Sequence, residues 1–254
     1  MTSPVNFSLA GRRALVTGAN TGLGQAIAIA LAAAGADIVG AGRSAMAEIE
    51  TAVTALGRRF LGLKVDLADI AAIAPLVEAA SGEAGPIDIL VNNAGIIRRT
   101  DALDFTEADW DEVMNVNLKA VFFLSQAVAR RMVAEKRRGR VINIASLLSF
   151  QGGIRIPSYT ASKSGLAGLT RLLACEWAAK GINVNAIAPG YFVTNNTAAL
   201  RADPERNAQI LARIPAGKWG EPSELGGAAV FLASDAASYV HGTVLAVDGG
   251  WLAR

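Results

Sequence analysis

The sequence predicts an α/β fold in which helices cover both faces of a doubly wound, seven-stranded parallel sheet. Short runs rich in Val and Ile alternate with Ala-rich segments of helical periodicity along the chain. The short runs are apolar at successive positions, which is typical of strands that are buried on both faces. No linker rich in Pro or Ser, repeat or low-complexity tract interrupts this pattern, so we expect residues 1–254 to form a single domain.

The expected elements follow from these runs in chain order. The first strand is expected at Ala14–Thr17, and the helix after it at Gly22–Ala34. The polar segment Tyr191–Trp219 lies between the sixth strand and the last long helix. We expect it to be a lid on the substrate side, and a surface excursion without a gating role is the alternative. The other strands are expected at Ala36–Gly40, Phe60–Val65, Ile87–Val91, Val141–Ala145, Asn183–Ala188 and Thr243–Val247.

Composition and charge exclude several classes of protein. With 254 residues, 52% of them hydrophobic, and 26 glycines, the chain is neither disordered nor collagen-like. Its formal charge of +2 provides no field strong enough to make nucleic acid or an anionic membrane the main partner. Cys175 and His241 are the only residues of their types, which excludes an intramolecular disulfide and a metal site of the usual Cys and His kind.

The sequence contains no recognisable targeting segment. Residues 1–13 have no basic region that leads into an apolar run. The longest apolar stretch, Ala26–Ala36, is about half the length of a membrane span. We therefore expect a cytoplasmic protein.

A glycine-rich turn follows the first strand directly. Its spacing, Gly-x-x-x-Gly-x-Gly, differs from the usual Gly-x-Gly-x-x-Gly, but its place between a strand and a helix favours a dinucleotide site over a plain turn. Glycines let the backbone approach a pyrophosphate, which then lies at the positive N-terminus of the helix. The expected contacts from this turn are Gly18, Asn20, Thr21, Gly22, Leu23 and Gly24.

Further candidate cofactor contacts follow the third and fourth strands, at the edge where open α/β sheets bind ligands. We expect the carboxylate that follows the third strand to contact the adenine ring, and the Asn-Asn-Ala-Gly turn after the fourth strand to form a wall beside the ribose. Ordinary capping of the strand ends is the alternative. The expected contacts here are Asp66, Leu67, Asn93, Ala94 and Gly95.

The end of the second strand bears on which dinucleotide is bound. About 20 residues past the glycines, an NAD-binding chain offers an acid to the ribose hydroxyls. This chain has Gly42, Arg43 and Ser44 there instead. A small Gly42 leaves room for a 2′-phosphate, which Arg43 and Ser44 can bind and neutralise. The sequence therefore favours NADP over NAD, with a solvated Arg43 as the alternative.

A tyrosine and a lysine follow the fifth strand with helical spacing. Tyr159 and Lys163 are four residues apart, which puts the phenol and the ammonium on one face of a helix. Reduction of a carbonyl by a nicotinamide needs a proton donor at the oxygen, and we expect Tyr159 to be that donor. Lys163 and the cationic nicotinamide would lower the pKa of the phenol from about 10 toward 7. Ser146, at the end of the strand, would hydrogen-bond the substrate oxygen.

Asn117 is a further candidate because it falls inside an expected helix, where asparagine is a poor helix former. This suggests a polar role, such as holding water that relays protons to Lys163. A buried asparagine whose hydrogen bonds are all satisfied is the alternative.

In combination these motifs resemble those of the short-chain dehydrogenases/reductases over nearly the whole chain. The resemblance implies a Rossmann sheet in the order 3-2-1-4-5-6-7, NAD(P)-dependent oxidoreductase activity on a CH–OH group, and a homotetramer. It also implies a loop on the nicotinamide side formed by Pro189, Gly190 and Thr194. The motifs that carry it are the two glycine-containing turns, the tetrad Asn117, Ser146, Tyr159 and Lys163, and the C-terminal Val247-Asp248-Gly249-Gly250.

Within that family, residues 96–99, 149–159, 191–196 and 214–219 resemble dehydrogenases of sugar acids. This implies an anionic keto-deoxy sugar acid as the substrate, and a carboxylate of that kind needs a cation. The loops on the pocket side contain three arginines, each of which can instead form a surface salt bridge. We expect Arg155 to bind the carboxylate. The three arginines are Arg98, Arg99 and Arg155, and the expected substrate contacts are Arg98, Gln151, Arg155 and Trp219.

Two other functions remain open. The basic residues Arg130, Arg131 and 136–140 could dock an acidic carrier protein, as in a reductase of 3-oxoacyl groups, although the solvated end of a helix is the simpler interpretation. The other function is a sensor that binds the dinucleotide without reacting. The complete tetrad argues against a sensor, since binding alone does not need Tyr159 and Lys163.

Overall fold

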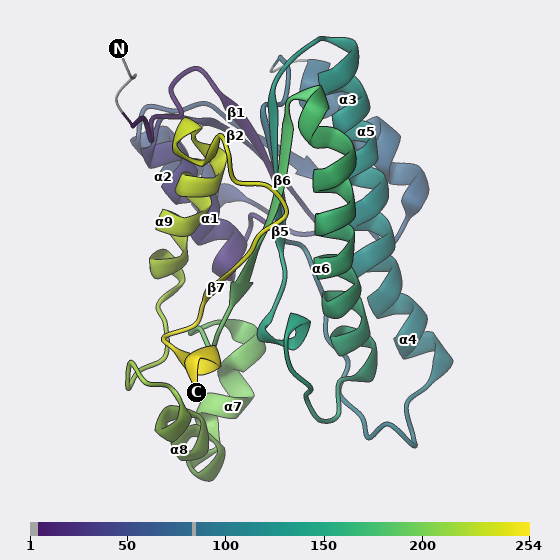
Figure 1. Ribbon diagram of the computed structural model, residues 1–254, viewed down its shortest axis with the longest axis vertical. Coiled ribbons are helices and arrows are strands. Elements are labelled where there is room, and N and C mark those ends of the chain that lie inside the picture. The colour runs from purple at the N-terminus through teal and green to yellow at the C-terminus, as the bar shows by residue number, and fades with distance from the viewer. Residues whose placement is uncertain (1–4, 83–84) are drawn as a thin grey trace.

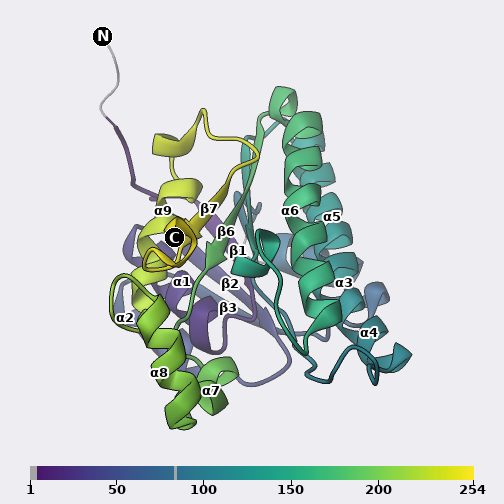
Figure 2. The same ribbon diagram turned by 60° about the horizontal axis from the view of Figure 1, so that its bottom comes forward.

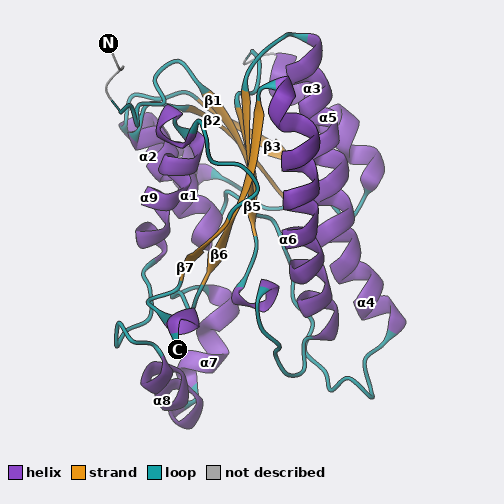
Figure 3. Ribbon diagram, viewed as in Figure 1, coloured by secondary structure: helices purple, strands orange, loops and turns teal. Residues whose placement is uncertain are grey.

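A computed structural model describes residues 5–82 and 85–254 of the chain (Figure 1). The strands form one seven-stranded sheet in the order β3-β2-β1-β4-β5-β6-β7, and every neighbouring pair is parallel. Figure 3 shows this sheet in the middle of the molecule, between two groups of helices. The predicted fold class is therefore confirmed, and so is the strand order that the family resemblance implied.

Each expected strand is present, with ends that differ from the expected ones by at most two residues. The differences arise at strand ends: β6, for example, includes Ile182 and Pro189, whereas Val65, Ile87 and Ala145 lie outside the strands. The strands are β1 (Arg13–Thr17), β2 (Asp37–Gly42), β3 (Phe60–Lys64), β4 (Ile89–Asn92), β5 (Gly139–Ile144), β6 (Ile182–Pro189) and β7 (Val244–Val247).

The helices form two layers, one on each face of the sheet (Figure 1). One layer contains α1, α2 and α9, and the other contains α3, α4, α5 and α6. Helices α7 and α8 lie beyond the carboxyl end of β6 (Figure 2). The helices are α1 (Gly22–Ala33), α2 (Ala47–Ala55), α3 (Ile73–Gly82), α4 (Glu107–Met114), α5 (Ala120–Ala134), α6 (Pro157–Trp177), α7 (Ala198–Ala202), α8 (Pro204–Arg213) and α9 (Gly226–Ala233).

Two apolar cores, one on each face, follow from strands that are apolar on both sides. In β1, Val16 belongs to the core under α1 and α9, whereas its neighbour Leu15 belongs to the core under α3, α5 and α6. All five residues of β1 are buried. Burial on both faces fixes the central strands firmly, so the loops at their carboxyl ends have a rigid base.

The basic run 136–140 differs from the expected solvated helix end. Helix α5 already ends at Ala134, and Arg140 lies inside β5 with only 3% of its surface exposed. Arg137 is half-buried and pairs with Asp88. The expectation of a solvated helix end was wrong for Arg140, because pairing of β5 with β4 and β6 draws it into the sheet, whereas Arg137 lies in the loop between α5 and β5.

Candidate active site

A cleft of about 490 Å³ opens at the carboxyl ends of the strands. Its walls come from loops that are far apart in the sequence, and they include the expected glycine turn, tyrosine and lysine. Such a position at the carboxyl edge of a doubly wound sheet is where ligands bind in this type of fold. All the expected cofactor contacts line this cleft, namely Gly18, Asn20, Thr21, Gly22, Leu23, Gly24, Arg43, Asp66, Leu67, Asn93, Ala94, Gly95, Tyr159, Lys163, Pro189, Gly190 and Thr194.

The glycine turn is packed so tightly against β4 that a side chain does not fit. Gly18 and Gly22 have φ angles of +66° and +56°, in the left-handed region that favours glycine. A Cβ on Gly24 would lie 2.2 Å from the carbonyl oxygen of Gly18 and 2.3 Å from Nδ2 of Asn93. Glycine at position 24 thus lets the first turn of α1 lie directly against Gly18 and the loop after β4.

Helix α1 presents its N-terminus to this cleft. Its N-cap, Thr21, makes no side-chain hydrogen bond to the first turn, and the first turn contains no acidic residue. The first N–H groups of a helix have no partner within the helix, and together with the helix dipole they bind anions. An uncapped N-terminus that lines a cleft fits the pyrophosphate of a dinucleotide.

The end of β2 contributes the residues that bear on the choice of dinucleotide. Nδ2 of Asn20 donates to Oγ of Ser44 at 2.6 Å. A Cβ on Gly42 would lie 2.9 Å from Oδ1 of Asn20. The side chain of Asn20 therefore occupies the space beside Gly42 that the sequence suggested for a phosphate. Arg43 and Ser44 line the cleft beside it. A hydroxyl, an amide and a guanidinium, with no acid among them, suit a 2′-phosphate.

Thr17 connects the glycine turn to the turn after β4. Its Oγ1 accepts hydrogen bonds from the backbone N–H groups of Asn93 and Ala94, both at 3.0 Å. Nδ2 of Asn93 in turn donates to the carbonyl oxygen of Thr17 at 2.9 Å. The amide of Asn93 is thus directed at protein, and its part in the cleft wall is to hold two loops together.

The expected catalytic side chains meet at the centre of the cleft. Tyr159 and Lys163 lie on successive turns of α6, and Ser146 lies just beyond the end of β5. The ammonium of Lys163 lies 5.6 Å from the centre of the Tyr159 ring and donates to the carbonyl oxygen of Ile144 at 2.6 Å. Oγ of Ser146 accepts from the backbone N–H of Leu148 at 3.3 Å. Three groups that can donate or accept a proton therefore line one space.

The pKa of the Tyr159 phenol is subject to opposing effects in this cleft. Burial raises the pKa of the phenol, while the Ser146 hydroxyl and the Arg99 guanidinium act in the opposite direction. The ammonium of Lys163 donates to the Ile144 carbonyl oxygen, and burial lowers its own pKa to about 8. The lowering of the phenol pKa toward 7 by Lys163 and the cationic nicotinamide together stays a prediction for the coenzyme-bound protein. In this cleft Tyr159 is a protonated donor.

Burial of Lys163 lowers the pKa of its ammonium to about 8, which predicts a specific pH dependence of stability. Between pH 8 and the ordinary lysine value near 10.5, the unfolded chain binds this proton and the folded chain does not. Stability of the wild type relative to Lys163→Met should therefore rise with pH, by roughly 2 kcal/mol between pH 7 and pH 9.5. Urea unfolding of both proteins at the two pH values measures it. A difference that is constant with pH would contradict the lowered pKa.

Asn117 lies in a π-helical turn, residues Asn115–Lys119, which connects α4 to α5. Its side chain is fully buried, and its amide both accepts from the N–H and donates to the carbonyl of Ile96, each at 2.9 Å. A single π-turn is common at functional sites. The sequence left open a water-holding role and a buried asparagine whose hydrogen bonds are satisfied within the protein. These bonds favour the second, in which Asn117 holds the loop after β4 in place.

The four expected substrate contacts do not line the cleft. Arg98 pairs with Glu112 at 2.6 Å, and the half-exposed Arg155 lies 3.5 Å from Asp101. Oε1 of Gln151 accepts from Arg213 and Trp251, both at 3.2 Å. Nε1 of Trp219 donates to Asn207 at 2.7 Å. Each of these side chains has a partner nearby in the fold, which the sequence did not reveal.

Arg99 does not line the cleft either, but its guanidinium lies near Tyr159. Arg99 donates to the carbonyl oxygen of Asn196 at 3.1 Å and is the guanidinium whose charge reaches the Tyr159 phenol. The sequence made Arg99 one of three candidates for the substrate carboxylate, but Arg155 was the one expected to bind it. The segment 191–219 contributes to the wall through Phe192, Thr194, Asn195, Asn196 and Thr197.

Two kinds of feature, a metal site and a membrane-spanning helix, are absent from the described part of the chain. In residues 5–82 and 85–254, no group of three or more His, Cys, Asp or Glu side chains is arranged to hold a metal ion. No helix within the same ranges is both long and apolar enough to cross a membrane.

Comparisons with known proteins give matches over nearly the whole chain. Residues 18–252 match the family described as enoyl-(acyl carrier protein) reductase. The 2-dehydro-3-deoxy-D-gluconate 5-dehydrogenase of Escherichia coli (strain K12) is 63% identical over 248 residues, which cover 98% of both chains. A crystal structure from Agrobacterium tumefaciens with bound NADP is 63% identical, has a TM-score of 0.94, and covers 99% of this chain and 100% of its own.

A crystal structure of a gluconate 5-dehydrogenase from Burkholderia cenocepacia, in complex with NADP and tartrate, is also similar. It is 41% identical, with a TM-score of 0.94 and 98% coverage of both chains. These matches extend over the sheet and the cleft alike. The chain is a member of the short-chain dehydrogenase/reductase family of oxidoreductases.

Proposed function

We propose that the protein interconverts a hydroxyl and a carbonyl group on a keto-deoxy sugar acid, with NADP or NAD as the coenzyme. The substrate pair that the relatives support best is 2-dehydro-3-deoxy-D-gluconate and its 2,5-diketo form. The observation that carries the proposal is the meeting of Ser146, Tyr159 and Lys163 in one cleft with the glycine turn. NADP is the preferred coenzyme because the end of β2 presents Arg43 and Ser44 and no acid.

The residues that would hold the coenzyme follow from the cleft wall. The N-terminus of α1 would bind the pyrophosphate, and Asn20, Arg43 and Ser44 would bind the 2′-phosphate. Asp66 and Leu67 would lie at the adenine, and Pro189, Gly190 and Thr194 beside the nicotinamide. When bound, the nicotinamide takes a hydride from the substrate carbon or returns it.

The chain's own groups would handle the substrate oxygen. Ser146 donates a hydrogen bond to that oxygen and orients it, and Tyr159 donates the proton in the direction of reduction. In the direction of oxidation Tyr159 must accept the proton, so its raised pKa has to fall first. The positive charge that lowers it in this chain is that of Arg99, and the ammonium of Lys163 lies 5.6 Å from the centre of the ring.

Arg99 is the residue that we propose for the substrate carboxylate, in place of Arg155. Arg99→Ala should raise the KM for a sugar acid by roughly 10-fold or more, since a charge-assisted hydrogen bond contributes about 1.5–3 kcal/mol. It should also move the pH profile of the reaction upward, because Arg99 is one of the two groups that lower the pKa of Tyr159. Initial rates against substrate concentration and pH measure both effects.

Arg155→Ala is the matched control for this substitution. Both arginines are exposed and carry the same charge, but the guanidinium of Arg155 lies 3.5 Å from Asp101, whereas that of Arg99 donates to the carbonyl oxygen of Asn196 and acts on the Tyr159 phenol. Its removal should leave the KM within about twofold of the wild type, which is the range expected for an exposed ion pair. A larger increase of KM in Arg155→Ala than in Arg99→Ala would reverse the assignment.

The proposed reaction is tested by initial rates with 2-dehydro-3-deoxy-D-gluconate and with an acetoacetyl thioester, each with NADP(H) and NAD(H). We expect the sugar acid to be turned over with the higher kcat/KM, and NADP(H) to be the better coenzyme. Preference for the thioester would favour the reductase of 3-oxoacyl groups. Binding of the dinucleotide without turnover of any keto acid or sugar would favour the sensor.

The arrangement of the whole chain completes the proposal. Residues 1–254 would act as one catalytic domain in the cytoplasm, with 191–219 as a lid whose residues already reach the cleft wall. A homotetramer is proposed on the family resemblance. It is supported by apolar side chains that are exposed on α5 and α6, namely Phe123, Val133 and Leu172.

A further inference from the structure

A second cavity, of about 260 Å³, lies at the opposite edge of the sheet from the cleft. It is formed where β1 and β5 begin and where the chain leaves α9, so its residues are near the amino ends of the strands. The charged side chains that line it are Arg12, Arg137, Arg138, Arg140, Asp88 and Asp235. Four guanidinium groups thus share one cavity with two carboxylates.

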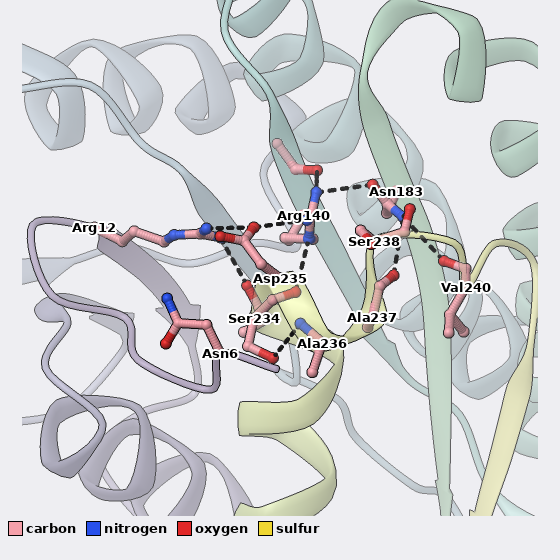
Figure 4. A network of polar contacts seen from close by, with 12 residues as sticks. Asn6, Arg12, Arg140, Asn183, Ser234, Asp235, Ala236, Ala237, Ser238 and Val240 are labelled. Atoms are coloured by element: carbon pink, nitrogen blue, oxygen red, sulfur yellow. Dashed lines mark hydrogen bonds and ion pairs between the residues drawn. The ribbon is translucent and has the colours of Figure 1, made fainter. Parts of the chain in front are cut away.

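Both carboxylates are already engaged by the arginines. Oδ1 of Asp235 lies 2.6 Å from Arg12 and 3.4 Å from Arg140, and Figure 4 shows this aspartate between the two guanidinium groups. Asp88 accepts from Arg137 and, at 2.9 Å, from the backbone N–H of Arg13. The lining therefore keeps a surplus of two positive charges.

The arginines are held in place by the surrounding protein. Arg12 donates to the carbonyl oxygen of Ala233 at 3.0 Å. Arg140, of whose side chain only 4% is exposed, donates to Oδ1 of Asn183 at 2.8 Å. Figure 4 shows how Asn183 and the turn after α9 surround it. A cation that is fixed in this way loses little side-chain entropy when it binds a further anion.

The positive charge at this cavity is not fully compensated. Among the described residues, Arg138 forms no ion pair, and the buried Nε of Arg137 has no hydrogen-bond partner. Burial lowers the pKa of Arg140, as do the neighbouring Arg12 and Arg138, while Asp235 acts against them. An additional anion would relieve this repulsion.

We propose that the cavity is a binding site for a phosphate group, either free phosphate or the phosphate of a small phosphomonoester. Guanidinium groups bind phosphate oxygens through paired hydrogen bonds. A phosphate dianion matches the surplus of two charges, which a single carboxylate does not. The cavity also has room for it, because a water molecule occupies about 30 Å³ of liquid. The cavity lies near the amino ends of the strands, at the opposite edge of the sheet from the cleft. The proposed phosphate site therefore does not depend on the proposed reaction.

The test is titration calorimetry with inorganic phosphate at constant ionic strength. Saturating NADP is present throughout, to block the phosphate-binding parts of the cleft. We expect one phosphate per chain. Arg138→Ala should weaken the binding by roughly 10-fold, since one charge-assisted bond is lost. Arg138 is exposed and has no ion pair within the described part of the chain, so this variant should fold normally. Arg12→Ala removes a second ligand and should weaken the binding as well.

Arg130→Ala is the control, because it removes the same charge from an exposed position on α5 outside the cavity. It should bind phosphate like the wild type. The proposal would be overturned if Arg130→Ala and Arg138→Ala lost phosphate affinity equally. It would also be overturned if phosphate gave no binding heat, or if chloride gave the same binding heat as phosphate. Tighter binding of an acidic peptide than of phosphate would also overturn it, in favour of a protein partner.

A comparison with ribose 5-phosphate separates the two sources of the phosphate group. Binding tighter than that of inorganic phosphate, with the same loss in Arg138→Ala, identifies a phosphomonoester. Equal or weaker binding identifies free phosphate. Both results support the site.

Discussion

Tyr159→Phe should lower kcat by about 10³-fold while the affinity for the coenzyme stays within twofold of the wild type. The substitution removes one oxygen, and the donor of a proton in the transition state contributes typically 10²–10⁴-fold to the rate. The ring remains, so the cleft keeps its shape. Steady-state rates give kcat, and fluorescence titration with the reduced coenzyme gives the affinity.

Tyr191→Phe is the matched control for this result. Tyr191 is also a tyrosine whose pKa is raised by burial, but it packs between Trp219 and Trp251 outside the cleft lining. Its removal should leave kcat within about twofold, because the hydroxyl does not reach the reacting atoms. If Tyr159→Phe kept more than a tenth of the wild-type kcat, another group would have to be the proton donor.

Gly24→Ala should abolish coenzyme binding at the concentrations that saturate the wild type, and it should also destabilise the protein. The added Cβ would lie 2.2 Å from the Gly18 carbonyl oxygen and 2.3 Å from Nδ2 of Asn93, so the turn or the start of α1 has to move. Overpacking of this kind costs about 1–3 kcal/mol. Titration with NADPH and urea unfolding measure the two losses.

Gly227→Ala controls for the general effect of alanine at a helical glycine. Gly227 lies on α9, and a Cβ there would meet no atom within 4 Å. The free energy of unfolding of this variant should be unchanged or higher by roughly 0.4–1 kcal/mol, because alanine restricts the conformations of the unfolded chain. Coenzyme binding should be unchanged. Wild-type binding by Gly24→Ala would show that the close packing of the turn is not needed for the cofactor site.

The proton chemistry at Tyr159 illustrates what spacing alone leaves undecided. The i, i+4 relation correctly predicted that Tyr159 and Lys163 lie on one face of α6. It did not predict that the ammonium binds the Ile144 carbonyl, or that burial raises the pKa of the phenol. These properties depend on β5, which precedes the helix in the chain and packs beside it only in the folded protein.

The arginines give a second example. From the sequence, Arg155 was expected to bind the carboxylate, with Arg98 and Arg99 as the other candidates. In the structure Arg98 is bound by Glu112 of α4, whereas Arg99 reaches Asn196 in the segment after β6. Likewise Arg140, expected at a solvated helix end, is buried in β5. Each outcome depends on a contact between residues that are far apart in the sequence.

The sequence by itself determined the strands, the helices between them, the glycine turn and the pairing of Tyr159 with Lys163. These features depend on hydrophobic periodicity and on short spacings, which are local properties of a chain. The tertiary structure alone decided which arginine reaches the phenol, what Asn117 binds, and where a surplus of positive charge collects between Arg12 and Arg140. Those depend on how the chain packs, because burial and charge pairing are set by neighbours from other elements.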